Sequence, residues 1–336
     1  MTNTTNQLTK KLDTLCRRVF GGSAQGLRRL SGGASQESWQ FSVKARHYVM
    51  RRTPNGQAED AGAAKLSLRH EGCLLRGLKA RGLAVAGVPY ICEAADGLGS
   101  AYIMDFIAGE TIARKILRDT IFDAVRPDLA AQCGTIIAGI HVADIGADIG
   151  ADIGGHLPQS GAAAELATYK GYLRGCDHPY PIFEMAIKWL EAHLPPPPKR
   201  SVLVHGDFRN GNLMITPDTG VVCVLDWELA HIGDPMEDLG WLCVPSWRFG
   251  VHDAPVGGFG NRETLYAAYT KAGGIVDERA ARFWEILGTL KWGIMCAVLM
   301  VNAFERGRDV SVERASIGRR SSETEIDLLR MILDKD

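Results

Sequence analysis

The side chains best suited to chemistry lie in one segment, Ser201–Leu239, which reads SVLVHGDFRNGNLMITPDTGVVCVLDWELAHIGDPMEDL. A short apolar strand leads into His205 and Asp207, and the residues TPDTG between the next two short strands predict a hairpin turn. Asn212 precedes the first hairpin strand and Asp226 ends the second. Because antiparallel pairing places such positions opposite each other, we expect Asn212 and Asp226 within about two residues of register, with Asp207 at the same end.

Two carboxylates and an amide oxygen at one place indicate a site for a hard cation. Oxygen ligands without histidine or thiolate suit Mg²⁺, which completes its shell with water and phosphate. A further carboxylate that the metal does not need can accept a proton from a substrate hydroxyl. Phosphoryl transfer from a nucleotide requires both functions, because the metal neutralises charge and the carboxylate orients the attacking oxygen.

The order and spacing of these residues resemble the aminoglycoside phosphotransferase-like kinases, a family of choline kinase type that shares the protein-kinase-like fold. The matching motifs are His205-Gly206-Asp207, Asn212, Leu225-Asp226-Trp227-Glu228, Gly233-Asp234-Pro235 and Asp238-Leu239. The HGDFR and DWE forms look most like the kinase-like domain that is fused to some acyl-CoA dehydrogenases. The resemblance extends over most of the chain, from about Leu27 to Phe304.

The resemblance implies an α+β, two-lobed protein-kinase-like fold, with a small antiparallel-sheet lobe over residues 1–106 and a larger, mostly helical lobe over residues 107–336. It implies an enzyme that moves the γ-phosphoryl group of ATP, or of GTP, to a hydroxyl group of a small molecule with Mg²⁺. By the same resemblance, Asp207 would be the catalytic base, and Asn212 and Asp226 the metal ligands. The acceptor would be a hydroxyacyl-type metabolite or an aminoglycoside-like compound.

The first third of the chain fits the same plan. The loop SGGAS would cover the nucleotide phosphates, because its glycines let backbone N–H groups approach them. Glu71 would pair with the cation of the third strand, and the hinge YIMDFIAG would bind adenine through its backbone. The nucleotide-binding residues that the resemblance implies are Gly32, Gly33, Ser35, Arg51, Glu71, Asp105 and Ile107.

One position departs from the family pattern, because the third strand carries arginine where lysine is usual. Alternation along YVMRR places Val49 and Arg51 on one face of the strand and Met50 and Arg52 on the other, so Arg51 is the candidate for the phosphates. Arginine keeps the charge but is not interchangeable with lysine. An alternative reading is therefore a catalytically weak kinase fold that binds a nucleotide or a partner.

Plainer readings exist for most of these residues. SGGAS alone is a common turn, Arg51 and Arg52 could be solvated charges of an edge strand, and Glu71 could be exposed on its helix. Asp226 and Asp238 could be helix caps, and His205 fits a structural histidine better than a ligand or proton shuttle. A metal-dependent hydrolase that uses His205, Asp207 and Asp226 is a weaker alternative, because no second histidine cluster accompanies it.

The elements that must position these residues can be read from periodicity. Apolar residues at helical spacing predict a helix over Leu8–Val19 and another over residues 66–78. Residues 28–52 read as a three-strand antiparallel meander, followed by a Pro-, Gly- and Ala-rich loop over 53–64. Strands over 88–91 and 100–107 complete a unit of five strands and one helix that follows the opening helix.

After Gly109 the pattern becomes helical. The tetrapeptide ADIG occurs three times over residues 143–154, and a glycine at every fourth position costs a helix about 1 kcal/mol each. We therefore read it as a loop after a helix that ends near His141, without chemistry of its own. Pro195–Pro198 is an extended run that leads into a strand. Helices return from Glu263 to the end, with a break near Gly273.

Composition limits the class of protein. The chain has 336 residues, 46% of them hydrophobic and 23% charged, which excludes a disordered or fibrous protein. The 38 Lys and Arg balance 39 Asp and Glu, so bulk charge does not favour a nucleic-acid or anionic-membrane partner. The expected partners are a nucleotide and a small-molecule acceptor.

Cysteine usage and the terminus point to a compartment. Eight scattered cysteines without a CxxC pair predict buried, reduced thiols in a cytoplasmic protein. The sequence MTNTTNQLTKK does not have the apolar core of a secretory signal. The longest apolar stretch, Trp292–Val301, has about half the length of a membrane span and reads as a buried helix.

Overall fold

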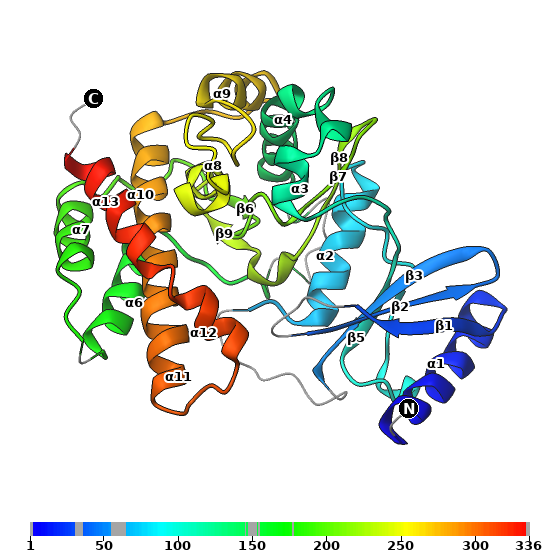
Figure 1. Cartoon of the computed structure of the whole chain (residues 1–336). Coiled ribbons are helices and arrows are strands. Elements are labelled where there is room, and N and C mark those ends of the chain that lie inside the picture. The colour runs from blue at the N-terminus through cyan, green and yellow to red at the C-terminus, as the bar shows by residue number, and fades with distance from the viewer. Residues whose placement is uncertain are drawn as a thin grey trace. The chain divides into compact units, whose positions relative to one another are not determined.

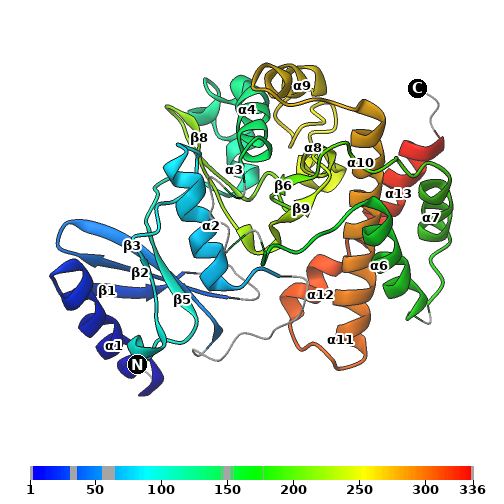
Figure 2. The same cartoon turned by 180° about the vertical axis from the view of Figure 1, so that it is seen from behind.

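A computed structural model describes residues 3–30, 36–54, 65–144, 146, 153, 155–176 and 178–333 (Figures 1 and 2). Contacts within it group the chain into two compact units. The first consists of Met1–Gly109, Ala143–Pro158 and Val222–Ala230, and the second of Glu110–Val142, Gln159–Val221 and His231–Asp336. The first unit thus takes two segments from beyond residue 106, and the simple boundary after that residue stays a prediction.

A five-stranded antiparallel sheet forms the first unit, in the order β1-β2-β3-β5-β4. Its strands are β1 (Ala24–Arg29), β2 (Glu37–Val43), β3 (Arg46–Arg52), β4 (Tyr90–Ile91) and β5 (Ala101–Asp105). The predicted meander is confirmed, although β1 begins four residues before the expected start and β4 has only two residues. Strands that follow each other in the sequence are paired, except β3 and β4, which α2 separates along the chain; β3 pairs with β5 instead.

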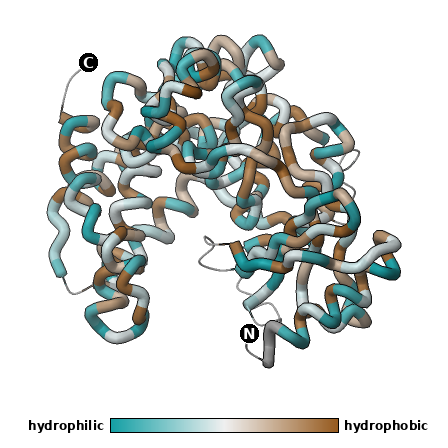
Figure 3. The backbone as a smooth tube through the Cα atoms, turned by 45° about the vertical axis from the view of Figure 1, so that its right-hand side comes forward, coloured by the Kyte–Doolittle hydropathy of each residue, from teal (hydrophilic) through white to brown (hydrophobic). Residues whose placement is uncertain are grey.

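Two helices pack on the sheet, α1 (Asn3–Phe20) and α2 (Leu68–Ala80). Leu12 and Cys16 of α1 are fully buried in a core with Phe41 and Met50 of the sheet, so the amphipathic helix predicted there is confirmed. The turns near the N label carry both apolar and polar residues in Figure 3. The opposite set of β3 residues, which includes Arg51, faces α2.

The second unit is mostly helical. Its longer helices are α3 (Ala113–Arg118), α4 (Leu129–His141), α6 (Ala162–Arg174), α7 (Pro181–Ala192), α8 (Met236–Cys243), α9 (Arg262–Lys271), α10 (Glu278–Ile294), α12 (Val312–Gly318) and α13 (Ser321–Leu333). The predicted end of a helix at His141 and the break between Lys271 and Glu278 are confirmed. Most of the ADIG repeat lies outside the described residues.

Short strands carry the motif segment. They are β6 (Val202–Val204), β7 (Leu213–Thr216), β8 (Gly220–Val224) and β9 (His231–Gly233). β7 and β8 form the predicted hairpin, and β6 pairs antiparallel with β9, a three-residue strand that the sequence reading did not include. The division between the two units falls within β8.

Helix α10 packs against α8, α13 and α7 and continues without a break. A π-helical segment (Met295–Asn302) and α11 (Ala303–Glu305) extend it, so that the run Glu278–Glu305 has 28 residues. By length and composition alone this run could cross a membrane, and it includes the apolar stretch Trp292–Val301, for which the sequence predicts a buried helix. Half of its most apolar window is buried within the protein.

Close packing of α8 on α10 depends on a glycine. A Cβ atom at Gly240 would lie 2.7 Å from the backbone nitrogen of Glu285 and 2.6 Å from Cβ of Trp284. Both distances are shorter than a normal contact, so a larger residue would push the helices apart. This approach matters because α8 carries Asp238 and Trp241, which contact the His205-Gly206-Asp207 motif. All eight cysteines are free thiols, and six of them are buried as predicted, whereas Cys73 and Cys176 are partly exposed.

Candidate active site

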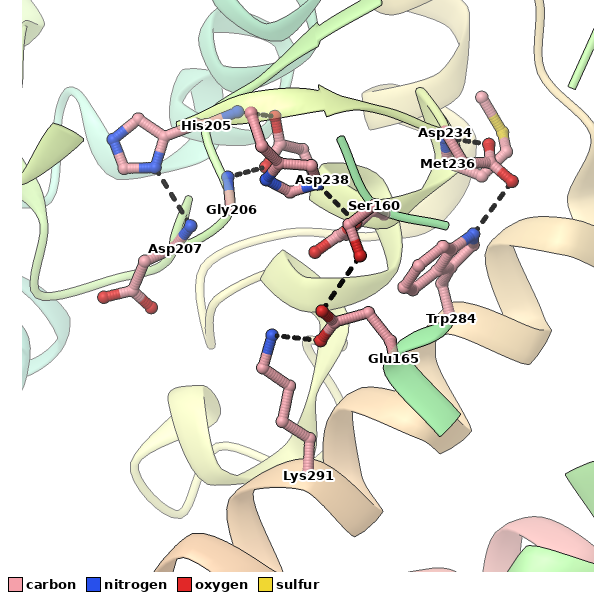
Figure 4. Close-up of polar contacts among 12 residues, drawn as sticks. Ser160, Glu165, His205, Gly206, Asp207, Asp234, Met236, Asp238, Trp284 and Lys291 are labelled. Atoms are coloured by element: carbon pink, nitrogen blue, oxygen red, sulfur yellow. Dashed lines mark hydrogen bonds and ion pairs between the residues drawn. The ribbon is translucent and has the colours of Figure 1, made fainter. Parts of the chain in front are cut away.

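The HGD motif follows β6 and is held by a buried carboxylate. Asp238 of α8 accepts the backbone N–H of His205 at 2.9 Å and that of Gly206 at 3.0 Å (Figure 4). His141 of α4 contacts the same carboxylate through Nε2 at 3.1 Å. Burial opposes a charge here, but the hydrogen bonds and charge of His141 hold the pKa of Asp238 below its usual value. Asp238 is therefore a support of the loop and not a helix cap.

His205 is also structural. Its side chain is fully buried, and its Nδ1 accepts the backbone N–H of Asp207 at 3.1 Å (Figure 4). That hydrogen bond fixes the imidazole ring within the loop. Within the residues that the structure describes, no group of three or more His, Cys, Asp and Glu side chains is arranged to hold a metal ion. This geometry favours the structural reading of His205 over the hydrolase reading.

The carboxylate of Asp207 receives three donors from the second unit. Oδ1 accepts Nε1–H of Trp241 at 2.7 Å and Nε–H of Arg209 at 3.0 Å. Oδ2 accepts the amide N–H of Asn212 at 2.6 Å, and the same amide donates to the backbone carbonyl of Asp207 at 3.0 Å. The carboxylate is thus fixed from both sides, and Oδ2 retains one lone pair.

Asn212 is available to a cation through one atom. Its amide nitrogen is engaged with Asp207, whereas its side-chain oxygen accepts no hydrogen bond from another described residue. A neutral oxygen ligand of this kind fits the donor set of Mg²⁺. Its juxtaposition with Asp226 stays a prediction, since the two residues belong to different units.

Asp226 belongs to the first unit, where Arg51 contacts it. Its backbone is left-handed, with φ of 65°, and its Oδ1 accepts Nη1–H and Nη2–H of Arg51 at 3.2 and 3.1 Å. Oδ2 has no hydrogen bond to a described residue, so this carboxylate also retains a free oxygen. The neighbouring residues anchor the segment, because Trp227 is buried and Glu228 pairs with Lys65 at 2.8 Å.

Arg51 and Glu71 form the ion pair that the resemblance implied. Nη1 of Arg51 lies 3.4 Å from Oε1 of Glu71, and Glu71 is only 1% exposed. Burial disfavours the charge of Arg51, but Glu71, Tyr102 and Asp226 together raise its pKa above the ordinary value. Arg52 faces the other way and lies 3.5 Å from Glu37. The solvated-charge reading of Arg51 and the exposed reading of Glu71 are both wrong.

Tyr102 of β5 contacts the Glu71 member of this pair. It is opposite Arg51 in the β3–β5 ladder, and its hydroxyl donates to Oε1 of Glu71 at 3.0 Å. The Tyr102 ring is fully buried against α2, where Gly72 allows the close approach. Burial raises the pKa of Glu71, and Arg51 and this hydrogen bond offset the effect only in part.

The hinge offers one residue with free backbone groups. The N–H of Asp105 donates to the carbonyl of Gly87 at 2.8 Å, and the N–H of Phe106 to that of His47 at 3.1 Å. The backbone of Ile107 has no hydrogen bond to another described residue. The resemblance implies Asp105 and Ile107 as the hinge residues that bind adenine. Of these two, Ile107 is thus the better candidate. Gly32, Gly33 and Ser35 lie outside the described residues, and their role stays a prediction.

An aromatic cluster lies under the Asp207 carboxylate. Trp241, Trp247 and Trp292 pack in sequence, with ring centroids 5.4 and 4.9 Å apart. Lys291 lies over the ring of Trp241 at 5.3 Å and pairs with Glu165 at 3.0 Å (Figure 4). Trp247 is therefore a core residue of this cluster, and it also supports Arg209, whose guanidinium lies 4.7 Å from its ring centroid.

Three contributors to the site were not identified from the sequence. Trp241 and Tyr102 are single aromatic residues far from their partners along the chain, and nothing in their local pattern distinguishes them from core residues. Arg209 had a signal, because it lies inside the HGDFRN motif two residues after the candidate base. Arg209 enters the sequence analysis only as one letter of the HGDFR motif, with no role predicted for its side chain.

Comparison with solved structures identifies the class of fold. A Ralstonia eutropha protein described as an aminoglycoside phosphotransferase superposes with a TM-score of 0.76 at 22% identity. The superposition covers 98% of this chain and 99% of that one. Aminoglycoside phosphotransferase APH(4)-Ia, in a ternary complex with AMP-PNP and hygromycin B, superposes with a TM-score of 0.60 at 16% identity. The superposition covers 97% of this chain and 99% of that one. At these identities the likeness shows the fold alone, which is the two-lobed α+β fold of the small-molecule phosphotransferases.

Sequence comparison gives the family. Residues 26–284 match the phosphotransferase enzyme family, and the chain belongs to it. Acyl-CoA dehydrogenase family member 10 of Mus musculus is 28% identical over 228 residues, which is 65% of this chain and 20% of that protein. Family member 11 of Gallus gallus is 27% identical over 241 residues, 68% of this chain and 29% of that protein. The chain thus spans less than a third of these relatives, and the expected family and subgroup are confirmed.

Proposed function

We propose that this protein transfers the γ-phosphoryl group of ATP to a hydroxyl group of a small molecule, with Mg²⁺ as the metal. The proposal is carried by one observation: the candidate base Asp207 is held in a fixed loop, with three donors on its carboxylate and Asn212 locked beside it. Family membership supports the reaction class. GTP as an alternative donor and a cytoplasmic location remain part of the proposal.

In this reaction the acceptor oxygen forms a bond with the γ-phosphorus, and the bond to the β,γ-bridging oxygen breaks. ADP leaves, and the hydroxyl proton goes to Oδ2 of Asp207 and then to solvent. Mg²⁺, when bound, would neutralise the charge of the phosphate oxygens. Asn212 and Asp226 would bind it, since each retains an unengaged oxygen. Arg51, held by Glu71, would contact the phosphates, with Ile107 binding the adenine.

Two acceptor classes are worth testing first. The curated relatives are named as acyl-CoA dehydrogenase family members, which favours a hydroxylated acyl compound. A structural neighbour is solved with hygromycin B, which makes an aminoglycoside-like compound the second class. Arg209 beside the base favours the first class, because a cation there repels a polycationic acceptor.

The test is ADP release across a panel of hydroxyl compounds, with Asp207→Asn as the variant. We expect turnover by the wild-type protein to fall by about a hundredfold or more in the variant, because general-base catalysis contributes on that scale. Asp253→Asn, which changes an exposed carboxylate, is the matched control and should behave as wild type. Unchanged turnover in Asp207→Asn would refute the assignment of the base.

The second candidate function is a nucleotide-binding module without catalysis. The observation that favours it is Arg51 in the position where lysine is usual, with its guanidinium engaged by Asp226. Mg²⁺-dependent binding of ATP without a phosphorylated product across the whole panel would support this reading and overturn the first.

A further inference from the structure

Arg209 has a fixed guanidinium directly beside the candidate base. Its Nε donates to Oδ1 of Asp207 at 3.0 Å, and Cζ lies 4.7 Å from the ring centroid of Trp247. Trp247 is buried, so the indole is a rigid support, while the side chain of Arg209 is 25% exposed. Asp207 therefore holds the guanidinium at its edge and Trp247 holds it at its face. The Arg209 side chain is not fully buried by these contacts.

The two terminal nitrogens of Arg209 are its donors without a described partner. Neither Nη1 nor Nη2 of Arg209 makes a hydrogen bond or ion pair with another described residue. The absence of a side chain at Gly211 leaves room for Nη1, because a Cβ atom there would lie 2.7 Å from it. Arginine presents its terminal donors as a planar fork that matches a carboxylate or phosphate. Two such donors are thus available next to the reacting carboxylate.

The other cations around the aromatic cluster are already neutralised. Lys291 pairs with Glu165 at 3.0 Å, and Arg248 pairs with Glu285 at 2.9 Å. Arg209 is balanced only by Asp207, according to the contacts that the described residues make. When Asp207 accepts the hydroxyl proton, its negative charge is lost and the charge of Arg209 is left without a partner. An anionic group on the acceptor would restore the balance.

We propose that the terminal nitrogens of Arg209 bind an anionic group of the acceptor, so that the preferred acceptors are hydroxy compounds with a carboxylate or a phosphate close to the hydroxyl. This inference rests on the proposed phosphotransferase function and defines its acceptor class. Carboxylate and phosphate share the chemistry that Arg209 recognises, and the experiment below distinguishes them. The same charge disfavours polycationic acceptors.

The test uses matched acceptors with the full-length chain. A short hydroxycarboxylate is paired with its primary amide, a hydroxyalkyl phosphate with the corresponding diol, and an amino alcohol provides the cationic arm. ADP release gives kcat/KM for each. In the wild-type protein we expect at least one anionic acceptor to exceed its neutral partner by about tenfold or more, the scale of a charge-assisted hydrogen bond. The better pair identifies carboxylate or phosphate.

Arg209→Gln should abolish this preference and Arg209→Lys should retain part of it. The readout is the ratio between paired acceptors, because any effect of the substitution on Asp207 itself acts on both members of a pair and cancels. Arg279→Gln, which removes an exposed guanidinium on α10, should leave the ratio unchanged.

The outcomes separate the inference from the proposed function. If the wild-type protein releases no ADP with any acceptor or with water, the proposed function fails. If it releases ADP but prefers neutral or cationic acceptors, or if Arg209→Gln keeps the anionic preference, the proposed function stands and the role of Arg209 is refuted.

Discussion

Nε1 of Trp241 donates a hydrogen bond of 2.7 Å to Oδ1 of Asp207, so that an indole on α8 fixes the carboxylate of the catalytic-loop motif. The indole is itself held from its face by Lys291, whose ammonium lies 5.3 Å from the ring centroid. Lys291 in turn pairs with Glu165 of α6. Three helices thus contribute to the position of one carboxylate, and Oδ2 is left as the atom that can receive a proton.

Replacing Trp241 with phenylalanine removes this donor and keeps an aromatic ring. We expect kcat to fall by about tenfold or more, because a hydrogen bond to a charged group contributes on that scale. The KM for nucleotide should change little, because Trp241 has no part in the Arg51–Glu71 pair. Steady-state kinetics with ADP release measures both values.

Trp292→Phe is the control for the loss of an indole from the same cluster. Nε1 of Trp292 has no hydrogen-bond partner among the described residues. This variant should therefore retain kcat. An equal fall of kcat in both variants would show that the cluster acts through packing alone and that the hydrogen bond to Asp207 has no special role.

Tyr102→Phe tests the support of Glu71. The variant removes the donor to a carboxylate that is 1% exposed, and we expect a loss of about 1–3 kcal/mol in the free energy of unfolding. Because Glu71 then holds Arg51 less firmly, the Kd for ATP should rise. Urea unfolding and calorimetric titration with ATP measure the two effects.

Tyr48→Phe is the matched control on the opposite face of the same sheet. Tyr48 is 3% exposed and packs with Phe41 in the α1 core, and its hydroxyl makes no hydrogen bond with another described residue. It should leave both stability and ATP affinity nearly unchanged. A weaker affinity for ATP in the Tyr48 variant would mean that the effect of Tyr102 is a general loosening of the sheet.

Asp238→Asn should show a pH-dependent loss of stability. The pKa of Asp238 is lowered in the folded protein, so its ionised form contributes stability above the ordinary aspartate value, and this contribution is lost as pH falls through the folded pKa. At pH 7 we expect a loss of about 3 kcal/mol, since a buried charged partner is removed. Below about pH 4, the ordinary aspartate range, the difference from wild type should shrink.

Thermal unfolding between pH 3 and pH 8 measures this difference. Asp253→Asn serves as the control, because that carboxylate is exposed. A difference between Asp238→Asn and wild type that stays constant over the whole pH range would contradict the charged role of Asp238.

The motif segment shows how far the sequence could predict the site. HGDFRN, the turn TPDTG and LDWE are local patterns, and the hairpin β7–β8 and the strand β6 follow from residues within a few positions of one another. The Arg51–Glu71 pair was predictable because strand alternation separates Arg51 from Arg52 and the family resemblance pairs Glu71 with the cation of the third strand. Local rules suffice where the partners lie in one element or where a known order of motifs links them.

Other parts required long-range contacts that a single sequence does not reveal. Trp241 reaches Asp207 across 34 residues, and Tyr102 reaches Glu71 across 31. β9 has only three residues and exists because β6 pairs with it. The apolar stretch Trp292–Val301 predicts a helix by itself, but only the structure shows that it continues α10 without a break.

The last prediction concerns the arginine that stands where lysine is usual. Arg51 uses Nη1 toward Glu71 and both terminal nitrogens toward Asp226, a fork that one ammonium group cannot reproduce. Arg51→Lys should therefore weaken ATP binding by about tenfold, the scale of one lost charged hydrogen bond, while Arg51→Met should weaken it further. Calorimetric titration with ATP and Mg²⁺ measures both. Tighter ATP binding by the lysine variant would instead show that arginine weakens nucleotide binding at this position, and would contradict the role of the fork.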